Sequence, residues 1–304
     1  MANTPVTVII PSYNRAHCIE KAIRSALAQT VSDAEILIAD DGSTDDTEGV
    51  VSGLGSPRVR YVRQQNAGCS SARNFGVSHA RSRYVAFLDS DDEWDPQWLA
   101  VALAALESEP AVGAVYASLE RVDADGHTTG VFDVSVGGRY REASVSYVLQ
   151  QCAGLLGSNV VARRDLVVGI GGWDETFPTS GDLDFGLRLA TASRVALVAS
   201  PMVRLIETGG SLSKKVNSGN RLRVLDKFER GHPALAQQHA RIIRHSRAAI
   251  LCSYGEDLLW VGRIAEAERQ LVASLRLLPS RRATWLLLKT QAFKLRGRAT
   301  GHQP

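Results

Sequence analysis

Residues 84–92 read YVAFLDSDD, an apolar run rich in aromatic and branched side chains that ends in an acidic cluster. Three other apolar runs precede it, at residues 6–10, 35–39 and 59–62, and the segments between them space their apolar residues as helices do. Alternation of short strands with helices over about 90 residues indicates a parallel sheet covered by helices. The sequence therefore predicts an α/β fold.

Polar residues directly follow three of these predicted strands. Residues 11–14 (PSYN) follow the first strand, residues 40–43 (DDGS) the second, and residues 89–92 (DSDD) the fourth. In an open parallel sheet, loops and helix N-termini converge beyond the carboxyl ends of the strands, and ligands bind there. We therefore expect the three segments to form one site.

The composition is that of a globular protein. The chain has 304 residues, of which 44% are hydrophobic and 22% are charged, enough for one core and a small appended module. Four cysteines without paired spacing argue against a disulfide framework or a zinc knuckle and fit a reducing compartment. The first apolar run lacks a preceding basic segment and ends at Pro11, so we expect no secretory signal and a cytoplasmic protein.

The second half of the chain changes in pattern. Strand signals at residues 112–119 and 159–162 and a helix at 183–190 should complete the first domain. Beyond residue 220 the long segments carry helical periodicity, which predicts an appended helical module. Residues 1–220 hold 19 Lys and Arg against 26 Asp and Glu, whereas residues 221–304 hold 16 against 6. The module is therefore the basic part of the chain.

Asp89 and Asp91 can direct carboxylate oxygens at one hard divalent cation, which would also take oxygens from a diphosphate. The alternative for this cluster is a solvated acidic turn. By itself, the pair does not decide between the two.

Six motifs follow one another in order. They read VTVIIPSYNR (6–15), ILIADDGSTDDT (36–47), NAGCSSARNFG (66–76), YVAFLDSDDEWDPQWL (84–99), GGWDETF (171–177) and GDLDFGLRL (181–189). With these motifs the chain resembles glycosyltransferase family 2 up to about residue 213. The resemblance implies a GT-A type fold, with a Rossmann-like, mostly parallel sheet flanked by helices. It also implies a domain over residues 1–215, with a nucleotide-binding half (1–110) and an acceptor half (111–215), followed by the helical module (216–304).

The resemblance assigns roles at the diphosphate end of the site. Asp89-Ser90-Asp91 matches the DxD motif of the family, so Asp91 would ligate Mn²⁺ or Mg²⁺, and Asp89 would hold the ribose or a metal-bound water. Arg73 would contact the nucleotide or its phosphates. The family often has a histidine as a further metal ligand within residues 203–213, where this chain has Arg204 and Glu207. Glu207 or water could take its place.

Other implied roles concern the base and the sugar. Asp41 would accept the imide N–H of uracil or thymine, Asp40 would brace its loop, Tyr13 would stack on the base and Pro11 would shape the strand end. The alternative for both aspartates is helix capping. Trp173 would stack on a sugar ring, and the alternative is a buried core residue.

The resemblance also implies transfer with inversion, which requires a base that deprotonates the acceptor hydroxyl. Asp182 is the candidate, and Gly181 stands before it where the family more often has Glu. The alternatives are that Asp182 only caps the following helix, or that Asp184 is the base.

The resemblance therefore implies an inverting, hexosyl-type glycosyltransferase that uses a UDP-sugar, or a dTDP-sugar, in polysaccharide or cell-envelope glycan synthesis. The acceptor would be a glycan or a glycolipid, and nucleic acid is not an expected partner. One alternative is a catalytically silent nucleotide-sugar-binding or assembly protein. Another is an Asp-nucleophile phosphatase, in which Glu93 stands where Thr or Val is expected.

The basic module has three interpretations: a solvated helical face, a peripheral contact with the inner face of an anionic membrane, or a docking site for a partner. Apolar and basic residues alternate over residues 281–296, as in an interfacial helix. Such a helix would suit an enzyme that acts on lipid-linked acceptors.

Overall fold

The computed structural model describes residues 5–123, 125–139, 141–151, 155–206 and 218–299. The chain divides into two compact units, residues 1–148 with 153–211 and residues 149–152 with 212–304. Each unit is described by itself below. The sequence placed the boundary at residue 215 and did not group residues 149–152 with the helical module.

The first unit alternates strands and helices. In chain order they are β1 (Val6–Ser12), α1 (Ile19–Leu27), β2 (Glu35–Asp40), α2 (Thr47–Gly53), β3 (Val59–Arg63), α3 (Cys69–His79), β4 (Tyr84–Phe87), β5 (Glu93–Trp94), α4 (Trp98–Ser108), β6 (Val112–Val122), β7 (Thr128–Phe132), the 3-10 turn η1 (Gly157–Asn159), β8 (Val160–Arg163), α6 (Arg164–Gly169), α7 (Gly181–Ala192) and β9 (Arg194–Ile206). Helix α5 (Val145–Gln151) lies at the division between the units.

The strands form one sheet in the order β3-β2-β1-β4-β8-β6-β9-β5, with β7 paired to β6. Strands β3, β2, β1 and β4 are parallel, and so is the pair β6 and β9. Strand β8 runs antiparallel to β4 and to β6. The predicted α/β fold with helices on a Rossmann-like sheet is confirmed, and the antiparallel β8 joins its two halves.

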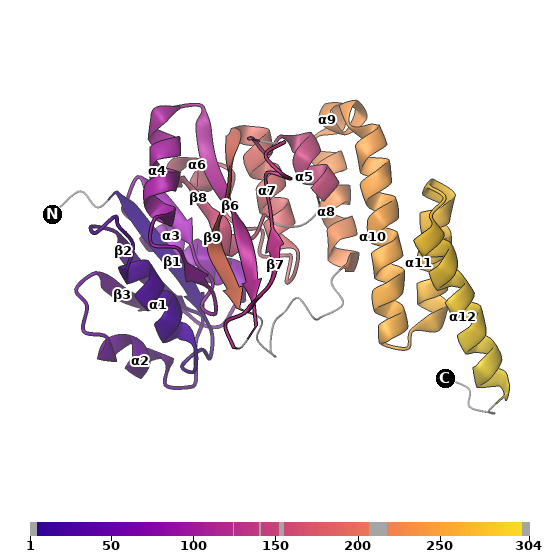
Figure 1. Cartoon of the computed structure of the whole chain (residues 1–304), viewed down its shortest axis with the longest axis horizontal. Helices are drawn as coiled ribbons and strands as arrows, with labels where there is room; N and C mark the ends of the chain where they lie inside the picture. Colours follow the sequence, from indigo (N-terminus) through magenta and orange to yellow (C-terminus); the bar gives the residue numbers. More distant parts are fainter. Residues whose placement is uncertain (1–4, 124, 140, 152–154, 207–217, 300–304) are drawn as a thin grey trace. The chain divides into compact units, whose positions relative to one another are not determined.

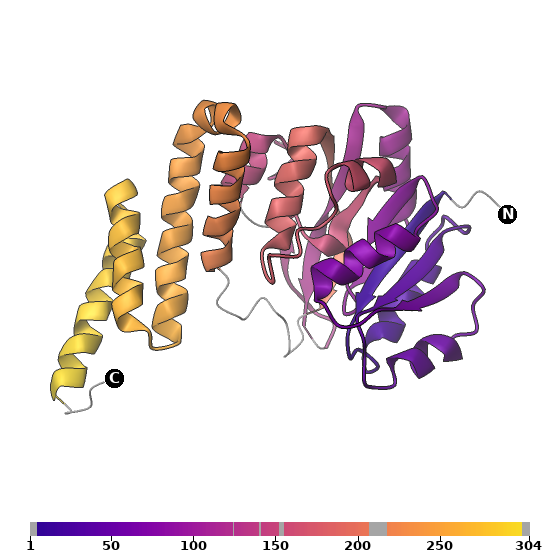
Figure 2. The same ribbon diagram turned by 180° about the vertical axis from the view of Figure 1, so that it is seen from behind.

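Helices cover both faces of this sheet. Figures 1 and 2 show α1, α2 and α4 on one face and α3, α6 and α7 on the other. Val8 and Ile10 of β1 belong to the core beneath α1 and α4. Because side chains alternate along a strand, Ile9 points to the opposite face, where α3 packs. A Cβ added at Gly76 of α3 would lie 2.4 Å from Ile9 Cγ2, so the glycine lets α3 approach β1 closely.

The second unit is helical, as the sequence predicts. It contains α8 (Ser218–Gly231), α9 (Pro233–Gln238), α10 (Ala240–Trp260), α11 (Ile264–Leu277) and α12 (Arg281–Ala299). A small core of Cys252, Leu271, Ala283 and Leu286 joins α10, α11 and α12. Among the described residues, no helix is both long and apolar enough to span a bilayer.

Candidate active site

The acidic loop after β4 lies at the carboxyl edge of the parallel strands, as predicted. Asp89 and Asp91 are partly exposed there, whereas Ser90 and Asp92 are buried. Arg15 Nη2 lies 3.7 Å from Asp91 Oδ2. Burial, together with the negative charge of Asp89, raises the pKa of Asp91. Neighbouring carboxylates repel each other and are stabilised by a cation, and oxygen donors of this kind suit Mg²⁺ or Mn²⁺.

Arg73 of α3 is almost fully buried beside this loop. Its Nη2 donates a hydrogen bond of 2.6 Å to Asp89 Oδ1. Its guanidinium carbon lies 4.4 Å from the ring centroid of Trp173. The pair fixes one oxygen of Asp89 and leaves the other without a bond from Arg73. Arg73 therefore orients the carboxylate at the centre of the predicted site.

Trp173 is 2% exposed and stacks on Phe185 of α7, with ring centroids 4.1 Å apart. Phe87 of β4 packs edge-on against the same ring at 5.5 Å. Arg73 and these aromatic neighbours cover the indole. Trp173 is therefore a buried core residue, which was the alternative to stacking on a sugar, because its ring fills the space between β4, α3 and α7. It offers no open face to a sugar and instead supports Arg73.

Asp182 occupies the second position of α7, whose N-cap is Ser180 with a positive φ of 67°. It therefore does not serve as the N-cap. Asp182 Oδ1 is buried, and among the described residues it has no hydrogen-bond partner. Burial raises the pKa of Asp182 to about 6, against the opposing effect of Arg73 and with a further increase from Asp89. A carboxylate with a raised pKa and an oxygen that no described residue bonds is suited to take a proton.

Asp184, the rival base, is engaged elsewhere. Arg188 Nε donates to Asp184 Oδ2 at 2.8 Å, and the carboxylate is buried. Arg188 Nη1 also donates to the backbone oxygens of Ile170 and Gly172, at 2.8 and 2.6 Å. Asp184 therefore holds Arg188 against the turn before Trp173. This arrangement favours Asp182 as the base.

Asp40 braces its own loop. Asp40 Oδ1 accepts hydrogen bonds from the backbone N–H of Gly42 (2.9 Å) and of Ser43 (2.7 Å). Asp40 Oδ2 accepts a hydrogen bond of 2.5 Å from Ser43 Oγ. The N-cap of α2 is Asp46, so neither Asp40 nor Asp41 caps this helix.

Asp41 joins two loops. Its Oδ1 accepts hydrogen bonds from Gln64 Nε2 (2.7 Å) and from the backbone N–H of Ala67 (2.9 Å). Its Oδ2 accepts one from the backbone N–H of Gly68 at 2.8 Å. A carboxylate offers about four acceptor sites, and the described residues fill three of those of Asp41, which leaves one on Oδ2. Asp41 thus positions the start of α3, and with it Arg73.

Tyr13 lies on the same edge and is 47% exposed, whereas Pro11 is buried at the end of β1. Asn14 follows Tyr13 with a positive φ of 54°. Its Oδ1 accepts a hydrogen bond of 2.7 Å from the backbone N–H of Thr44. Asn14 therefore ties the loop after β1 to the loop after β2 and presents the open ring of Tyr13.

The sequence profile of glycosyl transferase family 2 matches residues 7–167, which span β1 to β8 and the loops after β1, β2, β3 and β4, whereas the turn before Trp173 and the start of α7 with Asp182 lie beyond the match. The chain belongs to this family. The chondroitin synthase of Pasteurella multocida is 40% identical over 123 residues, covering 40% of this family 2 chain and 13% of the synthase. An uncharacterised glycosyltransferase of Rickettsia prowazekii is 30% identical over 195 residues, covering 62% of this chain and 60% of that protein.

Solved structures share the fold of this family 2 chain. TarS 1–349 of S. aureus in complex with UDP aligns with a TM-score of 0.66 and 16% identity, covering 98% of this chain and 92% of that one. The mannosyltransferase PcManGT of Pyrobaculum calidifontis, in complex with GDP-Man and Mn²⁺, aligns with a TM-score of 0.61 and 22% identity, covering 95% and 80%. At these identities the likeness establishes a GT-A type fold.

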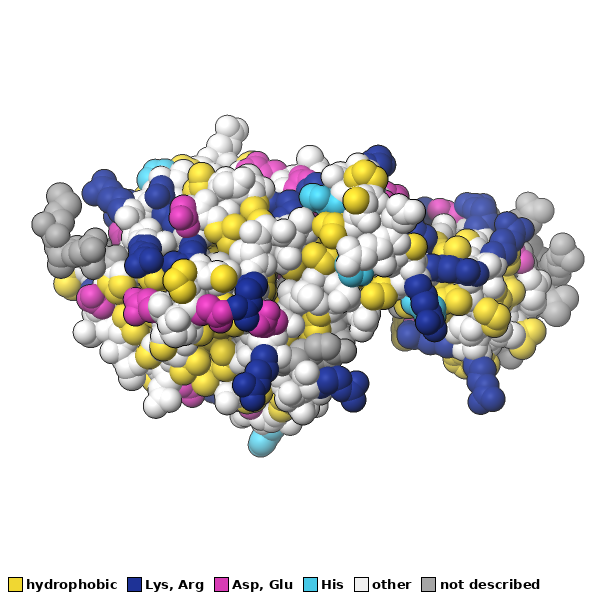
Figure 3. Space-filling view, turned by 90° about the horizontal axis from the view of Figure 1, so that it is seen from above, with side chains coloured by type: hydrophobic (Ala, Val, Ile, Leu, Met, Phe, Trp, Pro, Cys, Tyr) yellow, Lys and Arg dark blue, Asp and Glu magenta, His cyan; other side chains and the backbone are white. Residues whose placement is uncertain are grey.

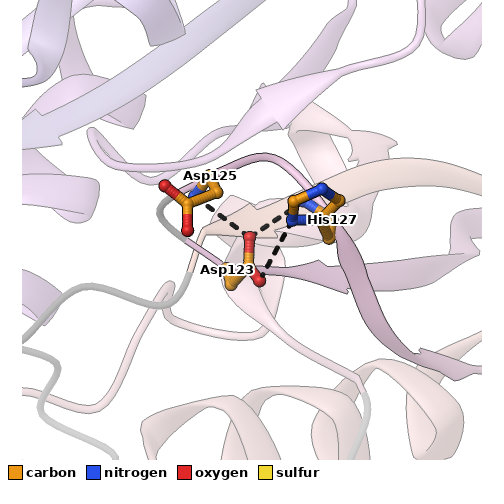
Figure 4. A group of neighbouring side chains, drawn as sticks. All are labelled: Asp123, Asp125 and His127. Carbon is orange, nitrogen blue, oxygen red and sulfur yellow. Dashed lines mark hydrogen bonds and ion pairs between the residues drawn. The ribbon is translucent and has the colours of Figure 1, made fainter.

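A second group of potential metal ligands lies in the turn between β6 and β7. Asp123, Asp125 and His127 bring their ligand atoms within 4.8 Å of one another (Figure 4). Asp123 Oδ1 accepts hydrogen bonds from the backbone N–H of Asp125 (3.0 Å) and of His127 (2.9 Å). The cluster is thus explained by a carboxylate that closes a hairpin turn. Glu207, the predicted substitute ligand, lies outside the described residues.

Four further residues shape the site without having been assigned a role from the sequence. Arg15, Gln64 and Ser158 contact the predicted residues Asp91, Asp41 and Asp89, and Asn14 bonds Thr44 in the loop after β2. Arg15 and Asn14 fall within the motif at residues 6–15, and this position is the only signal that could have found them. Gln64 and Ser158 lie outside the six motifs.

Proposed function

We propose that this chain transfers a hexosyl group from a nucleoside diphosphate sugar to an acceptor hydroxyl, with inversion. The observation that carries the proposal is the buried oxygen of Asp182 beside Arg73 and Asp89, which has no hydrogen-bond partner among the described residues. Inversion needs a base on the side of the sugar opposite the departing diphosphate. Asp182 is the base, and the acidic loop after β4 holds the diphosphate.

The site residues fit a divalent cation. Asp89 and Asp91 present oxygen donors at a partly open position, and their mutual repulsion is relieved by positive charge. Asp91, with Asp89, would hold Mn²⁺ or Mg²⁺. When bound, the cation offsets the charge of the diphosphate. Arg73 keeps Asp89 in place, and Asp182 takes the proton of the acceptor hydroxyl on its free oxygen.

A UDP-sugar is the proposed donor. The exposed ring of Tyr13 can stack on the base, and the remaining acceptor site of Asp41 can take the imide N–H of uracil. The solved structure of TarS with UDP supports this choice, and that of the mannosyltransferase with GDP-Man makes guanine the competitor to test.

The proposed acceptor is a glycan or glycolipid of a polysaccharide or cell-envelope pathway. Relatives named chondroitin synthase and hyaluronan synthase, each 40% identical over 123 residues, support a polysaccharide. The match spans only 13% of either synthase, so the support for this acceptor comes from the shared segment alone.

We also propose that the helical unit contacts an anionic membrane peripherally. Trp285 and Leu288 of α12 are 53% and 65% exposed. They line a shallow apolar groove together with Arg281 and Thr284. Lys289 Nζ lies 3.7 Å from the ring centroid of Trp285. Figure 3 shows Lys and Arg side chains gathered on the surface of this unit. Exposed tryptophan and leucine framed by cations suit the interface of an anionic bilayer.

The test of the proposed reaction is release of nucleoside diphosphate from a panel of UDP-, dTDP- and GDP-sugars, with Mn²⁺ or Mg²⁺ and with chelator. We expect release from a UDP-sugar that stops in chelator. Asp182→Asn should keep donor binding and lose transfer by about 10²-fold or more, because the base is removed. Asp184→Asn is the matched control, which should lower the melting temperature and retain transfer.

Three results would contradict parts of this proposal. Full turnover by Asp182→Asn would reject the base. Undiminished turnover in chelator would reject the metal. Donor binding without release from any nucleotide sugar would favour the silent binding protein.

A further inference from the structure

A short buried turn, η1, lies behind the acidic loop. Ser158 is 1% exposed and Asn159 is fully buried. Asn159 anchors the turn, because its Nδ2 donates to the backbone oxygen of Ala117 at 2.7 Å and its Oδ1 accepts from the backbone N–H of Leu156 at 2.9 Å. Strand β8 follows at once and pairs with β4 and β6 in the middle of the sheet. The turn is therefore tied to the rigid part of the first unit.

Ser158 makes three hydrogen bonds to the acidic loop and the residues after it. Its Oγ accepts from the backbone N–H of Asp89 at 3.1 Å and donates to Asp92 Oδ2 at 2.5 Å. Its backbone oxygen accepts from Trp94 Nε1 at 2.8 Å. These bonds hold the loop at both ends, with Asp91 between them.

Gly157, the first residue of the turn, touches the other parts of the site. A Cβ at this position would lie 2.5 Å from Arg73 Nη2, so only glycine leaves Arg73 its place beside Asp89. The backbone of Gly157 also interacts with the Asp182 carboxylate. One turn thus contacts the acidic loop, the arginine and the proposed base.

We propose that Ser158 is a positioning residue that holds the Asp89–Asp92 loop in the conformation that binds a divalent cation and the nucleoside diphosphate. The role rests on the proposed function. The Ser158 hydroxyl has a single proton, which it gives to Asp92, and it uses an oxygen lone pair for the Asp89 N–H. Without the hydroxyl, the Asp89 amide and the Asp92 carboxylate each lose a partner, and the loop is free to take other conformations.

The experiment compares Ser158→Ala with Ser118→Ala. Ser118 of β6 is a matched control, because it is fully buried in the same unit and its Oγ bonds Asp133 and the backbones of Val134 and Val198, away from the acidic loop. Calorimetry measures the affinity for UDP and for GDP at several Mn²⁺ concentrations, and thermal melts record stability. If Ser158→Ala does not fold, the same measurement is made on Ser158→Cys, in which a thiol, a weaker hydrogen-bond donor, fills the same space.

We expect Ser158→Ala to raise the Mn²⁺ concentration at half-saturation by about tenfold, the usual effect of removing a residue that orients a metal ligand. Ser118→Ala should lower the melting temperature and leave that concentration unchanged. Wild-type half-saturation in folded Ser158→Ala or Ser158→Cys would overturn the positioning role while leaving the proposed function intact. A wild-type protein that binds neither nucleotide in the presence of Mn²⁺ would overturn the proposed function, and the positioning role with it.

Discussion

At the start of α7, Asp182 has one carboxylate oxygen that no described residue bonds, and its neighbour Arg73 is positively charged. Loss of solvent favours the protonated acid, while Arg73 favours the carboxylate, and the first effect is the larger. The resulting pKa of about 6 lies close to neutrality. Asp182 is thus ionised at pH 7 and still has a higher proton affinity than an exposed aspartate, as a general base requires.

This pKa predicts the pH dependence of transfer. Because the ionised form is the base, kcat/KM should rise about tenfold per pH unit below pH 6 and level off above it. Initial rates between about pH 4.5 and pH 8 at saturating metal measure the profile, and circular dichroism at each pH confirms that the protein is folded. A kcat/KM that stays constant down to about pH 4.5, as expected for an aspartate with an ordinary pKa of about 4, would assign the base to an exposed carboxylate.

Among the secondary-structure elements, α3 carries Arg73 into the site and depends on its close packing against β1. Gly76→Ala would place a methyl group 2.4 Å from Ile9 Cγ2. We expect the variant to lose about 1–3 kcal/mol of unfolding free energy, because the core has no room for the group. Gly53→Ala at the end of α2 meets nothing within 4 Å and should be neutral or slightly stabilising. Denaturant unfolding measures the free energy of unfolding of both variants. If Gly76→Ala were as stable as Gly53→Ala, α3 would be able to shift at little energetic cost.

The elements of the parallel core could be predicted because each is a local pattern. The runs at residues 6–10 and 35–39 lie within β1 and β2, and the helix expected at residues 183–190 lies within α7. The position of the site at the carboxyl edge of the sheet could also be predicted, because it depends only on the direction of the parallel strands. The two-residue β5 and the turn η1 could not be predicted, because they depend on partners far along the chain. Ser158 bonds Asp92 66 residues away, and no local pattern encodes such a contact.

The same limit applies to the site. The acidic loop and Asp40 follow from strand endings and motif, and the structure brings them to one edge. Whether Trp173 faces a ligand or the core depends on Phe185 and Arg73, which only the folded chain brings together. An aromatic residue beside glycines fits both outcomes, which is why two interpretations of Trp173 stayed open.

For the whole molecule, charge distribution separates the two parts of the chain. The acidic excess of residues 1–220 lies with the domain proposed to bind a cation, and the basic excess of residues 221–304 lies in the helical unit. A solvated basic face alone would not need exposed apolar side chains. Trp285 and Leu288 on α12 provide them beside Lys289. This combination favours the membrane contact over a merely solvated face.

Vesicle co-sedimentation tests the contact on the full chain. We expect pelleting with vesicles that contain about one-third anionic lipid, little pelleting with neutral vesicles, and a decrease as salt rises, because the charges are screened. The double variant Trp285→Ser with Leu288→Ser should bind at least about tenfold more weakly, since two apolar side chains no longer enter the interface. Val131→Ser of β7, which changes an equally exposed apolar residue (58%) in the first unit, should bind as the wild type does. Binding by the double variant at the wild-type level would refute the contact through α12. Equal binding to neutral and anionic vesicles would refute the electrostatic contribution to that contact.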